Sequence, residues 1–160
     1  MPFFRFFRKR NSPYIRPSIE LASLVERRAE EFSAFYKERF GYRLNYRQGS
    51  LGILDLILSE ARYSALSPEW KQWLAVHAGA YLFRVASQRF HDWPLQYLWY
   101  HPLEQPVLVV GAPVFRISML AQQAVLQRLE EREEPPLPVF FERFEKAVLP
   151  AAEGDDLLFM

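Results

Sequence analysis

Residues 69–90, with the sequence EWKQWLAVHAGAYLFRVASQRF, constrain the fold of this chain more than any other segment. Ser67 can cap the first helical turn, Pro68 suits the first position, and Glu69 complements the positive end of the helix dipole. Apolar residues then cover most of the circumference, which is typical of a helix buried among several elements. The pattern therefore predicts a central helix. The residues that we expect in the core are Ala78, Leu82, Val85 and Ala86.

A narrow stripe along this helix carries the candidate ligand-binding residues. Its members recur at spacings of three and four, so they share one face. They are His77, Tyr81, Arg84, Gln88 and His91. In a groove against the sheet, Arg84 could bind a carboxylate or phosphate while His77 and Tyr81 orient it. Alternatively, Arg84 and Gln88 face water and His77 is a satisfied core or rim histidine.

Two helices are expected before the central one. The first covers about residues 18–40 and ends at Gly41. Residues 42–46 then form either a short edge strand or an extended connector. Ser50 is the expected cap of the second helix, which contains Asp55. Asp55 could be a pocket carboxylate with a perturbed pKa; alternatively it is exposed or pairs with a nearby arginine.

The character of the chain changes after Pro94, which disfavours helix at the preceding residue. Short segments rich in aromatic and branched residues predict strands over residues 95–100, 106–110 and 114–117. Helices follow over about 118–134 and from Pro138 to before Pro150. We therefore expect an α+β fold: a small antiparallel sheet of about three strands, packed against the buried central helix and three or four further helices.

We divide the chain into an N-terminal arm (1–17), a single domain (18–150) and a C-terminal tail (151–160). The arm is basic and aromatic, and it lacks the continuous apolar stretch of a secretory signal. It could lie on an anionic membrane, bind nucleic acid, or pack on the domain or a second subunit. Its partner-contact candidates are Phe3, Phe4, Arg5, Phe6, Phe7, Arg8 and Arg10. The tail either docks on the domain or marks a partner contact.

Several kinds of chemistry lack their usual residues. The chain has no cysteine, no glycine-rich phosphate loop and no Gly-x-Ser-x-Gly elbow. Its histidines are too far apart in sequence to form a ligand pair on one turn, although His91, Asp92 and His101 could meet across the first strand. We therefore expect no catalytic residues, no metal site and no cofactor.

Two segments, YRLNYRQGSLGILDLIL and HAGAYLFRVASQRF, precede a Trp-Tyr strand and PVLVVG. This layout resembles small bacterial α+β domains of unknown function, in which a serine-led leucine helix with an acid precedes a Gly-x-Tyr helix. The matching positions are Ser50, Leu54, Asp55, Gly79 and Tyr81. The chain departs from such relatives at Phe83-Arg84, where they often carry Gly-Glu. The resemblance implies the fold over about residues 18–145 and carries no activity with it.

We therefore expect a bacterial, cytoplasmic accessory or interaction protein without catalysis of its own. Its partner would be another protein or a second copy of the chain. One alternative is a small anionic-ligand binder or enzyme that uses His77, Tyr81 and Arg84. The other is a peripheral membrane or nucleic-acid binder that acts through the basic arm.

Overall fold

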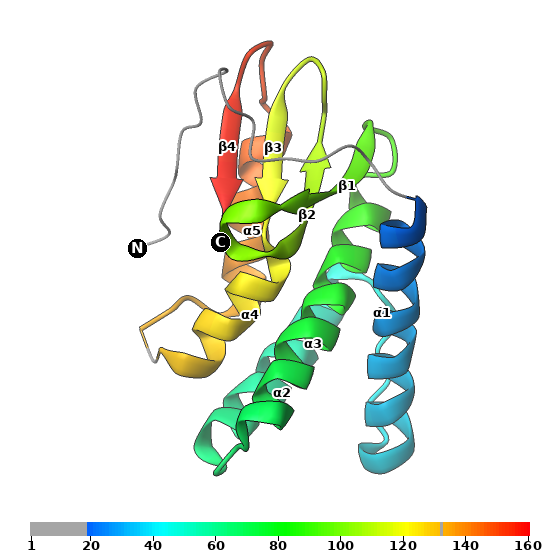
Figure 1. The fold of residues 1–160 in the computed structure, drawn as a ribbon, viewed down its shortest axis with the longest axis vertical. Coiled ribbons are helices and arrows are strands. Elements are labelled where there is room, and N and C mark those ends of the chain that lie inside the picture. Colours follow the sequence, from blue (N-terminus) through cyan, green and yellow to red (C-terminus); the bar gives the residue numbers. More distant parts are fainter. Residues whose placement is uncertain (1–18, 132) are drawn as a thin grey trace.

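The computed structural model describes residues 19–131 and 133–160; the arm and its contact candidates, Phe3 to Arg10, lie outside them. The described chain is α+β, as predicted, with five α-helices and a four-stranded sheet (Figure 1). The helices are α1 (Ile19–Phe40), α2 (Leu51–Tyr63), α3 (Pro68–Arg89), α4 (Ala121–Glu130) and α5 (Leu137–Val148). The strands are β1 (Leu95–Tyr100), β2 (Gln105–Val110), β3 (Arg116–Met119) and β4 (Asp156–Phe159).

Helix α3 is the central element, as the sequence predicts. The Ser67 hydroxyl accepts a hydrogen bond from the Trp70 N–H at 3.2 Å, so the predicted cap forms. All four predicted core residues of α3 are buried. Helices α1, α2 and α4 surround it in Figure 1. Where α3 meets α4, a Cβ at Gly79 would lie 2.9 Å from the Gln122 Cα, so only glycine permits this close approach.

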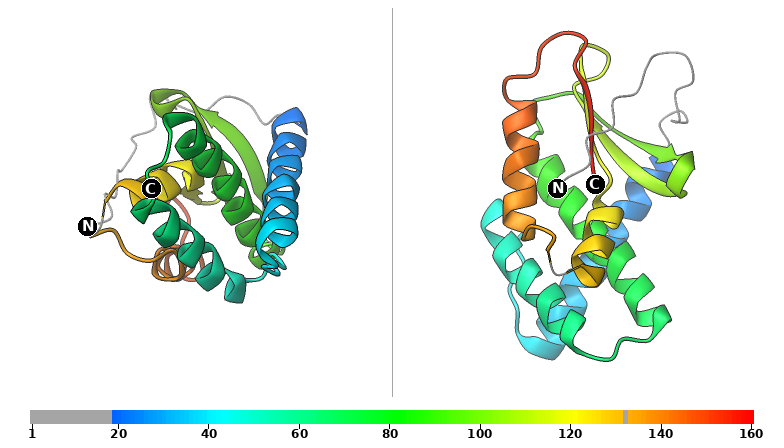
Figure 2. Two further views of the ribbon diagram at one scale, coloured as in Figure 1. Left: turned by 90° about the horizontal axis from the view of Figure 1, so that it is seen from below. Right: turned by 90° about the vertical axis from the view of Figure 1, so that its left-hand side faces the viewer.

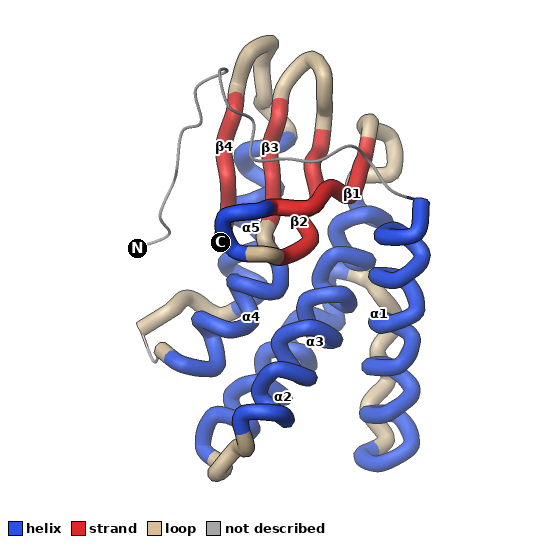
Figure 3. The backbone as a smooth tube through the Cα atoms, viewed as in Figure 1, coloured by secondary structure: helices blue, strands red, loops and turns tan. Residues whose placement is uncertain are grey.

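The sheet has the strand order β1-β2-β3-β4, and its first three strands are antiparallel (Figure 3). The fourth strand corrects the predicted count of about three. It comes from the C-terminal tail, where Asp156–Phe159 pairs in parallel with β3. The tail therefore docks on the body of the protein. A parallel partner is reached only through a long connection, here α4 and α5, so local sequence gives little sign of it.

Two predicted boundaries are displaced by the turn between β2 and β3. Gly111 there has a φ of +94°, and a Cβ on it would overlap the Phe115 ring. Phe115 thus belongs to the turn, and β3 begins at Arg116 instead of residue 114. Helix α4 accordingly begins at Ala121, three residues later than expected. Residues 42–46 form the connector, not a strand.

The main core lies between the helices and one face of the sheet. Phe90, Phe141, Phe144 and Phe159 meet there, with ring centroids 5.4–6.1 Å apart. Figure 2 shows α5 running alongside the strands on this side. No helix in the described part of the chain is long and apolar enough to cross a membrane.

Candidate functional site

The predicted stripe on α3 faces α1 and the connector, where its polar groups meet protein partners. His77 stacks on Trp73 with centroids 4.2 Å apart. Its Nδ1 lies 2.9 Å from the Trp73 carbonyl oxygen, and its Nε2 lies 2.9 Å from Glu31 Oε2 of α1. Both ring nitrogens are therefore engaged within the protein, as the satisfied-histidine alternative expects.

Tyr81 is fully buried, and its hydroxyl holds the connector in place. This hydroxyl accepts a hydrogen bond from the Tyr46 N–H at 2.9 Å and lies 2.6 Å from Ser50 Oγ. Ser50 in turn donates to the Arg47 carbonyl oxygen at 2.6 Å. These bonds fix Tyr46 at a φ of 61°, which is unusual for a residue other than glycine. Burial raises the pKa of Tyr81, although its hydrogen bonds with Ser50 and Tyr46 oppose the shift.

The same network corrects the predicted role of Ser50. Its side chain makes no capping bond to α2 and is instead committed to Arg47 and Tyr81. Two positions of the resembled motif, Ser50 and Tyr81, are thus direct partners. This gives the motif a structural role in joining the connector to α3.

Arg84 is occupied as well. Its Nη1 lies 3.2 Å from Glu30 Oε1 of α1, and its guanidinium sits 4.1 Å from the centroid of the Tyr46 ring. An anion at this position would compete with Glu30 for the guanidinium. Gln88, further along the stripe, is exposed and borders a hollow of about 220 Å³.

His91 lies just beyond the end of α3, where its Nδ1 is 2.9 Å from the Gln88 carbonyl oxygen. Its Nε2 is 3.1 Å from Asp92 Oδ1, and both side chains are exposed. His101 follows β1, a six-residue strand that separates it from His91 by roughly 20 Å at about 3.3 Å per residue. Among residues 19–131 and 133–160, no three His, Asp or Glu side chains are placed to hold a metal ion.

Asp55, the acid of the resembled motif, pairs with an arginine, as one of its alternatives expects. Its carboxylate accepts two bonds from Arg128 of α4, at 2.9 and 3.1 Å, and one from the Leu137 N–H at 2.9 Å. Burial opposes ionisation of Asp55, but these bonds outweigh it and hold its pKa below the ordinary value. The pair ties α2 to α4 and to the start of α5.

A hollow larger than the one beside Gln88 lies elsewhere, between the end of α1, the connector, α2 and the start of α3. We call it the aromatic cleft. Its volume is about 550 Å³, within the roughly 300–1,000 Å³ of small-molecule sites. It is lined by Phe35, Tyr36, Arg39, Phe40, Tyr42, Ile57, Glu60, Ala61, Ser64 and Trp70.

Aromatic rings form a continuous wall in this cleft. Tyr36, Phe40 and Tyr42 lie with centroids 5.4–6.4 Å apart, and Phe35 contacts Trp70 at 5.3 Å. Phe40 is 60% exposed, a large fraction for such a ring. The wall therefore has apolar surface that a partner can reach from the solvent.

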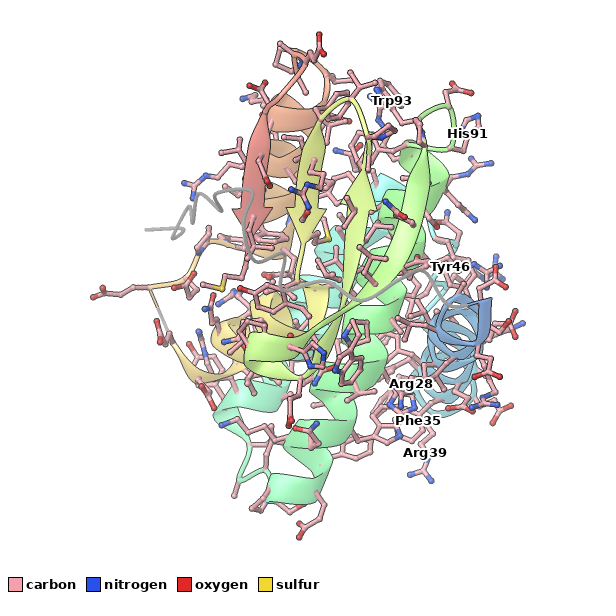
Figure 4. The ribbon with its side chains drawn as sticks, turned by 45° about the horizontal axis from the view of Figure 1, so that its top comes forward. Arg28, Phe35, Arg39, Tyr46, His91 and Trp93 are labelled. Carbon is pink, nitrogen blue, oxygen red and sulfur yellow. The ribbon has the colours of Figure 1, made fainter. Side chains whose placement is uncertain are left out.

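One charge of each sign borders the wall. The Arg39 guanidinium lies 4.9 Å from the centroid of the Phe35 ring, and the two residues lie together on α1 in Figure 4, away from His91. Glu60 faces them from α2. Burial, reinforced by the Glu60 and Tyr42 charges, raises the pKa of Tyr36 to about 12, so its hydroxyl stays neutral at physiological pH. The cleft can thus hold an apolar group and pair charged groups beside it.

Comparison of the sequence with family models, curated proteins and solved structures finds no match.

Sequence reasoning did not assemble the aromatic cleft. Phe35, Tyr36 and Phe40 fall in the first predicted helix and Tyr42 in the segment after it, and no spacing links them as a site. The available signal was the run of rings around Gly41, the end of that helix. Trp70 comes from a distant segment, and only the packing of α1 against α3 brings it to the same wall.

Proposed function

We propose that this protein is an interaction module that uses the aromatic cleft to bind an apolar side chain from an extended segment of a partner protein. The exposed aromatic wall, and Phe40 above all, carries this proposal. Tyr, Trp and Arg dominate the binding energy of protein interfaces, because they bury large areas and still form polar contacts. The cleft brings these residue types together with few competing internal bonds.

A peptide segment suits the cleft better than an anion does. Arg39 and Glu60 lie on different walls, so a partner carrying both signs of charge beside an apolar anchor is matched on both sides. The stripe of His77, Tyr81 and Arg84 supports the anion-binding alternative less, because Glu31, Ser50 and Glu30 already occupy its polar groups. A bacterial, cytoplasmic setting stays an expectation from sequence.

A phage-displayed random peptide library, panned against the full-length chain, tests the proposal. The enriched peptides should share an aromatic or large aliphatic anchor flanked by charged residues. Phe40→Ser should lower the affinity for a selected synthetic peptide roughly tenfold or more in isothermal titration, which corresponds to a loss of about 1.4 kcal/mol of binding free energy. Since Phe40 is 60% exposed, its replacement leaves the core intact.

Leu149→Ser is the matched control. Leu149 is 51% exposed and lies at the end of α5, outside the cleft. This variant should bind the peptide as the unchanged chain does. Equal binding by the Phe40→Ser chain, or no enrichment at all, would contradict the proposal.

A further inference from the structure

The hollow beside Gln88, about 220 Å³ in volume, lies between the last turns of α3 and the short 3₁₀ turn Gln48–Ser50 that follows the connector. Its lining residues are Tyr46, Arg47, Gln48, Val85, Gln88 and Arg89. We call it the arginine hollow. It is separate from the aromatic cleft, because the two have no lining residue in common.

The inner wall of the arginine hollow is apolar and fixed. Val85 is 1% exposed and belongs to the main core. The Tyr46 ring stacks on the Tyr81 ring at 5.0 Å, and the Arg84 guanidinium lies 4.1 Å from its centroid. These contacts hold the Tyr46 ring in place beside Val85. A small hydrocarbon group entering the hollow would therefore meet a preformed apolar surface.

The rim carries hydrogen-bond donors that the protein itself does not use. Arg47, Gln48 and Gln88 are exposed, and within residues 19–131 and 133–160 their side chains form no hydrogen bond or ion pair. Arg89 donates from Nε to Glu145 Oε2 at 2.6 Å, which leaves its two terminal nitrogens available. Two guanidinium groups and one carboxylate give this rim one positive charge in excess.

The backbone that carries Arg47 is held firmly, although its side chain is not bonded. The Arg47 N–H donates to Asn45 Oδ1 at 3.1 Å, and its carbonyl oxygen accepts from Ser50 Oγ at 2.6 Å. Tyr46, just before it, is kept at a φ of 61° by the bond from its N–H to the Tyr81 hydroxyl. Strained backbone of this kind clusters at binding sites. A donor that is positioned in advance also loses less entropy when a ligand binds.

We propose that the arginine hollow binds a small monocarboxylic acid. Its carboxylate would bond to Arg47 and to the unused nitrogens of Arg89, since guanidinium groups match a carboxylate with two parallel bonds. Its short apolar body would lie on Val85. A single excess positive charge balances a monoanion, whereas a phosphate dianion would also be repelled by Glu145. The volume is below the roughly 300–1,000 Å³ of sites for drug-sized ligands, so the ligand is small.

This site differs from the anion site expected from sequence. Of the five stripe residues, Gln88 alone lines the arginine hollow. The arginine at the centre of the predicted site, Arg84, is paired with Glu30, whereas the Arg47 side chain has no partner in the described ranges. The new site also stands independently of the aromatic cleft, so peptide binding at the cleft can fail without affecting it.

An NMR titration of the full-length, ¹⁵N-labelled protein with sodium butyrate at constant ionic strength tests the proposal. The side-chain N–H signals of Arg47, Gln48 and Gln88 should shift and reach saturation. Butyramide has the same shape without the charge and should bind at least about tenfold more weakly. Inorganic phosphate should also bind more weakly than butyrate. Shifts that do not saturate, or equal or tighter binding of butyramide or phosphate, would overturn the proposal.

Two substitutions in neighbouring arginines provide the matched comparison. Arg47→Gln should lower the affinity for butyrate about tenfold or more and leave the melting temperature unchanged, because the lost guanidinium bonds to no described residue. Arg43 is exposed on the connector and does not line the hollow, so Arg43→Gln should bind butyrate as the unchanged chain does. Equal butyrate affinity in the two variants would overturn the proposal.

Gln88→Glu provides an independent measurement at the opposite rim. It places a second carboxylate beside the hollow, which should repel butyrate and weaken its binding while leaving butyramide unaffected. Gln88 is exposed, so the fold tolerates the change. Unchanged butyrate binding in this variant would mean that the carboxylate lies elsewhere, and the proposal would be wrong.

Discussion

Two aspartate–arginine pairs join distant parts of this chain, and they differ in how completely each carboxylate is bonded. Asp55 accepts three hydrogen bonds, two from Arg128 and one from a backbone N–H. Asp156 accepts one, from Arg116 at 3.0 Å, and its Oδ1 is buried without a hydrogen-bond partner in the described structure. The two carboxylates are similarly shielded, with 15% and 18% of their side chains exposed.

The pKa shifts of the two acids run in opposite directions. Burial raises the pKa of Asp156, and Arg116 compensates only in part. Burial acts on Asp55 in the same sense, but the bonds to Arg128 and Leu137 reverse its effect and lower the pKa. Bonding to the charged form, more than depth of burial, therefore decides whether each carboxylate stabilises the fold as an ion.

The largest expected effect is that of Asp55→Ala. The substitution leaves Arg128, which is 8% exposed, without its carboxylate. Removing one partner of a buried pair costs about 3–5 kcal/mol, and we expect a loss of that size in the free energy of unfolding at pH 7. Urea denaturation monitored by circular dichroism measures it.

Lowering the pH should reduce the difference in stability between the unchanged chain and the Asp55→Ala variant. A lowered pKa means that Asp55 contributes stability above its unfolded pKa of about 3.9, and that this contribution disappears as the pH falls through the folded value. The gap between the unchanged chain and the Asp55→Ala variant should therefore narrow below about pH 4. A gap that is constant from pH 7 to pH 2 would mean that packing, not charge, accounts for it.

Tyr81→Phe tests whether a fully hydrogen-bonded buried group also stabilises the fold when it carries no charge. It removes the hydroxyl between Tyr46 and Ser50 and leaves the buried Ser50 with one partner fewer. The expected loss is about 1–3 kcal/mol. Amide hydrogen exchange should also quicken at Tyr46, because its N–H loses its acceptor. Tyr97→Phe is the matched control, since its hydroxyl makes a longer bond of 3.5 Å to the Phe83 carbonyl oxygen.

The fold could be predicted where its causes are local. Helix α3 has its cap at Ser67, its first-turn proline and its apolar circumference within one stretch of sequence, and all three features act as expected. Strand β4 depends instead on β3, which lies about 40 residues away in the chain. The start of β3 depends on how Phe115 folds over Gly111. Neither cause can be read from a short window of sequence.

The candidate site was harder to predict for a related reason. Spacing correctly indicates that the residues of the α3 stripe share a face. It cannot indicate that Glu30 and Glu31 of α1 lie opposite them and form hydrogen bonds with Arg84 and His77. Asp55 and Arg128 are likewise 73 positions apart. The rings of the aromatic cleft come from three segments. Partners of this kind are defined only when helices pack.

Glu30→Gln should have a small effect, although Glu30 also pairs with an arginine. The Glu30 side chain is 66% exposed, and Arg84 keeps its contact with the Tyr46 ring when the acid is removed. Exposed pairs contribute about 0.2–1 kcal/mol, and salt weakens them. We expect a loss in that range, smaller still in high salt. A loss as large as that of Asp55→Ala would mean that the packing of α1 on α3 depends on the Glu30–Arg84 pair in spite of its exposure.

Asp156→Asn should change stability least, and at pH 7 it should stabilise the protein where the other substitutions destabilise it. A raised pKa means that the folded state holds the proton of Asp156 more tightly than the unfolded state does, so stability is lost as the pH rises through the folded value. Asparagine removes that loss and still offers an oxygen to Arg116, which is partly exposed and can reach water.

The variant should be as stable as the unchanged chain at about pH 3, where Asp156 is protonated. At pH 7 its stability should equal that of the unchanged chain or exceed it by less than about 1 kcal/mol. Thermal unfolding at the two pH values measures this difference. If the variant instead becomes steadily less stable than the unchanged chain between pH 3 and pH 7, Arg116 holds the ionised Asp156 as firmly as Arg128 holds Asp55. The contrast between the two pairs would then be wrong.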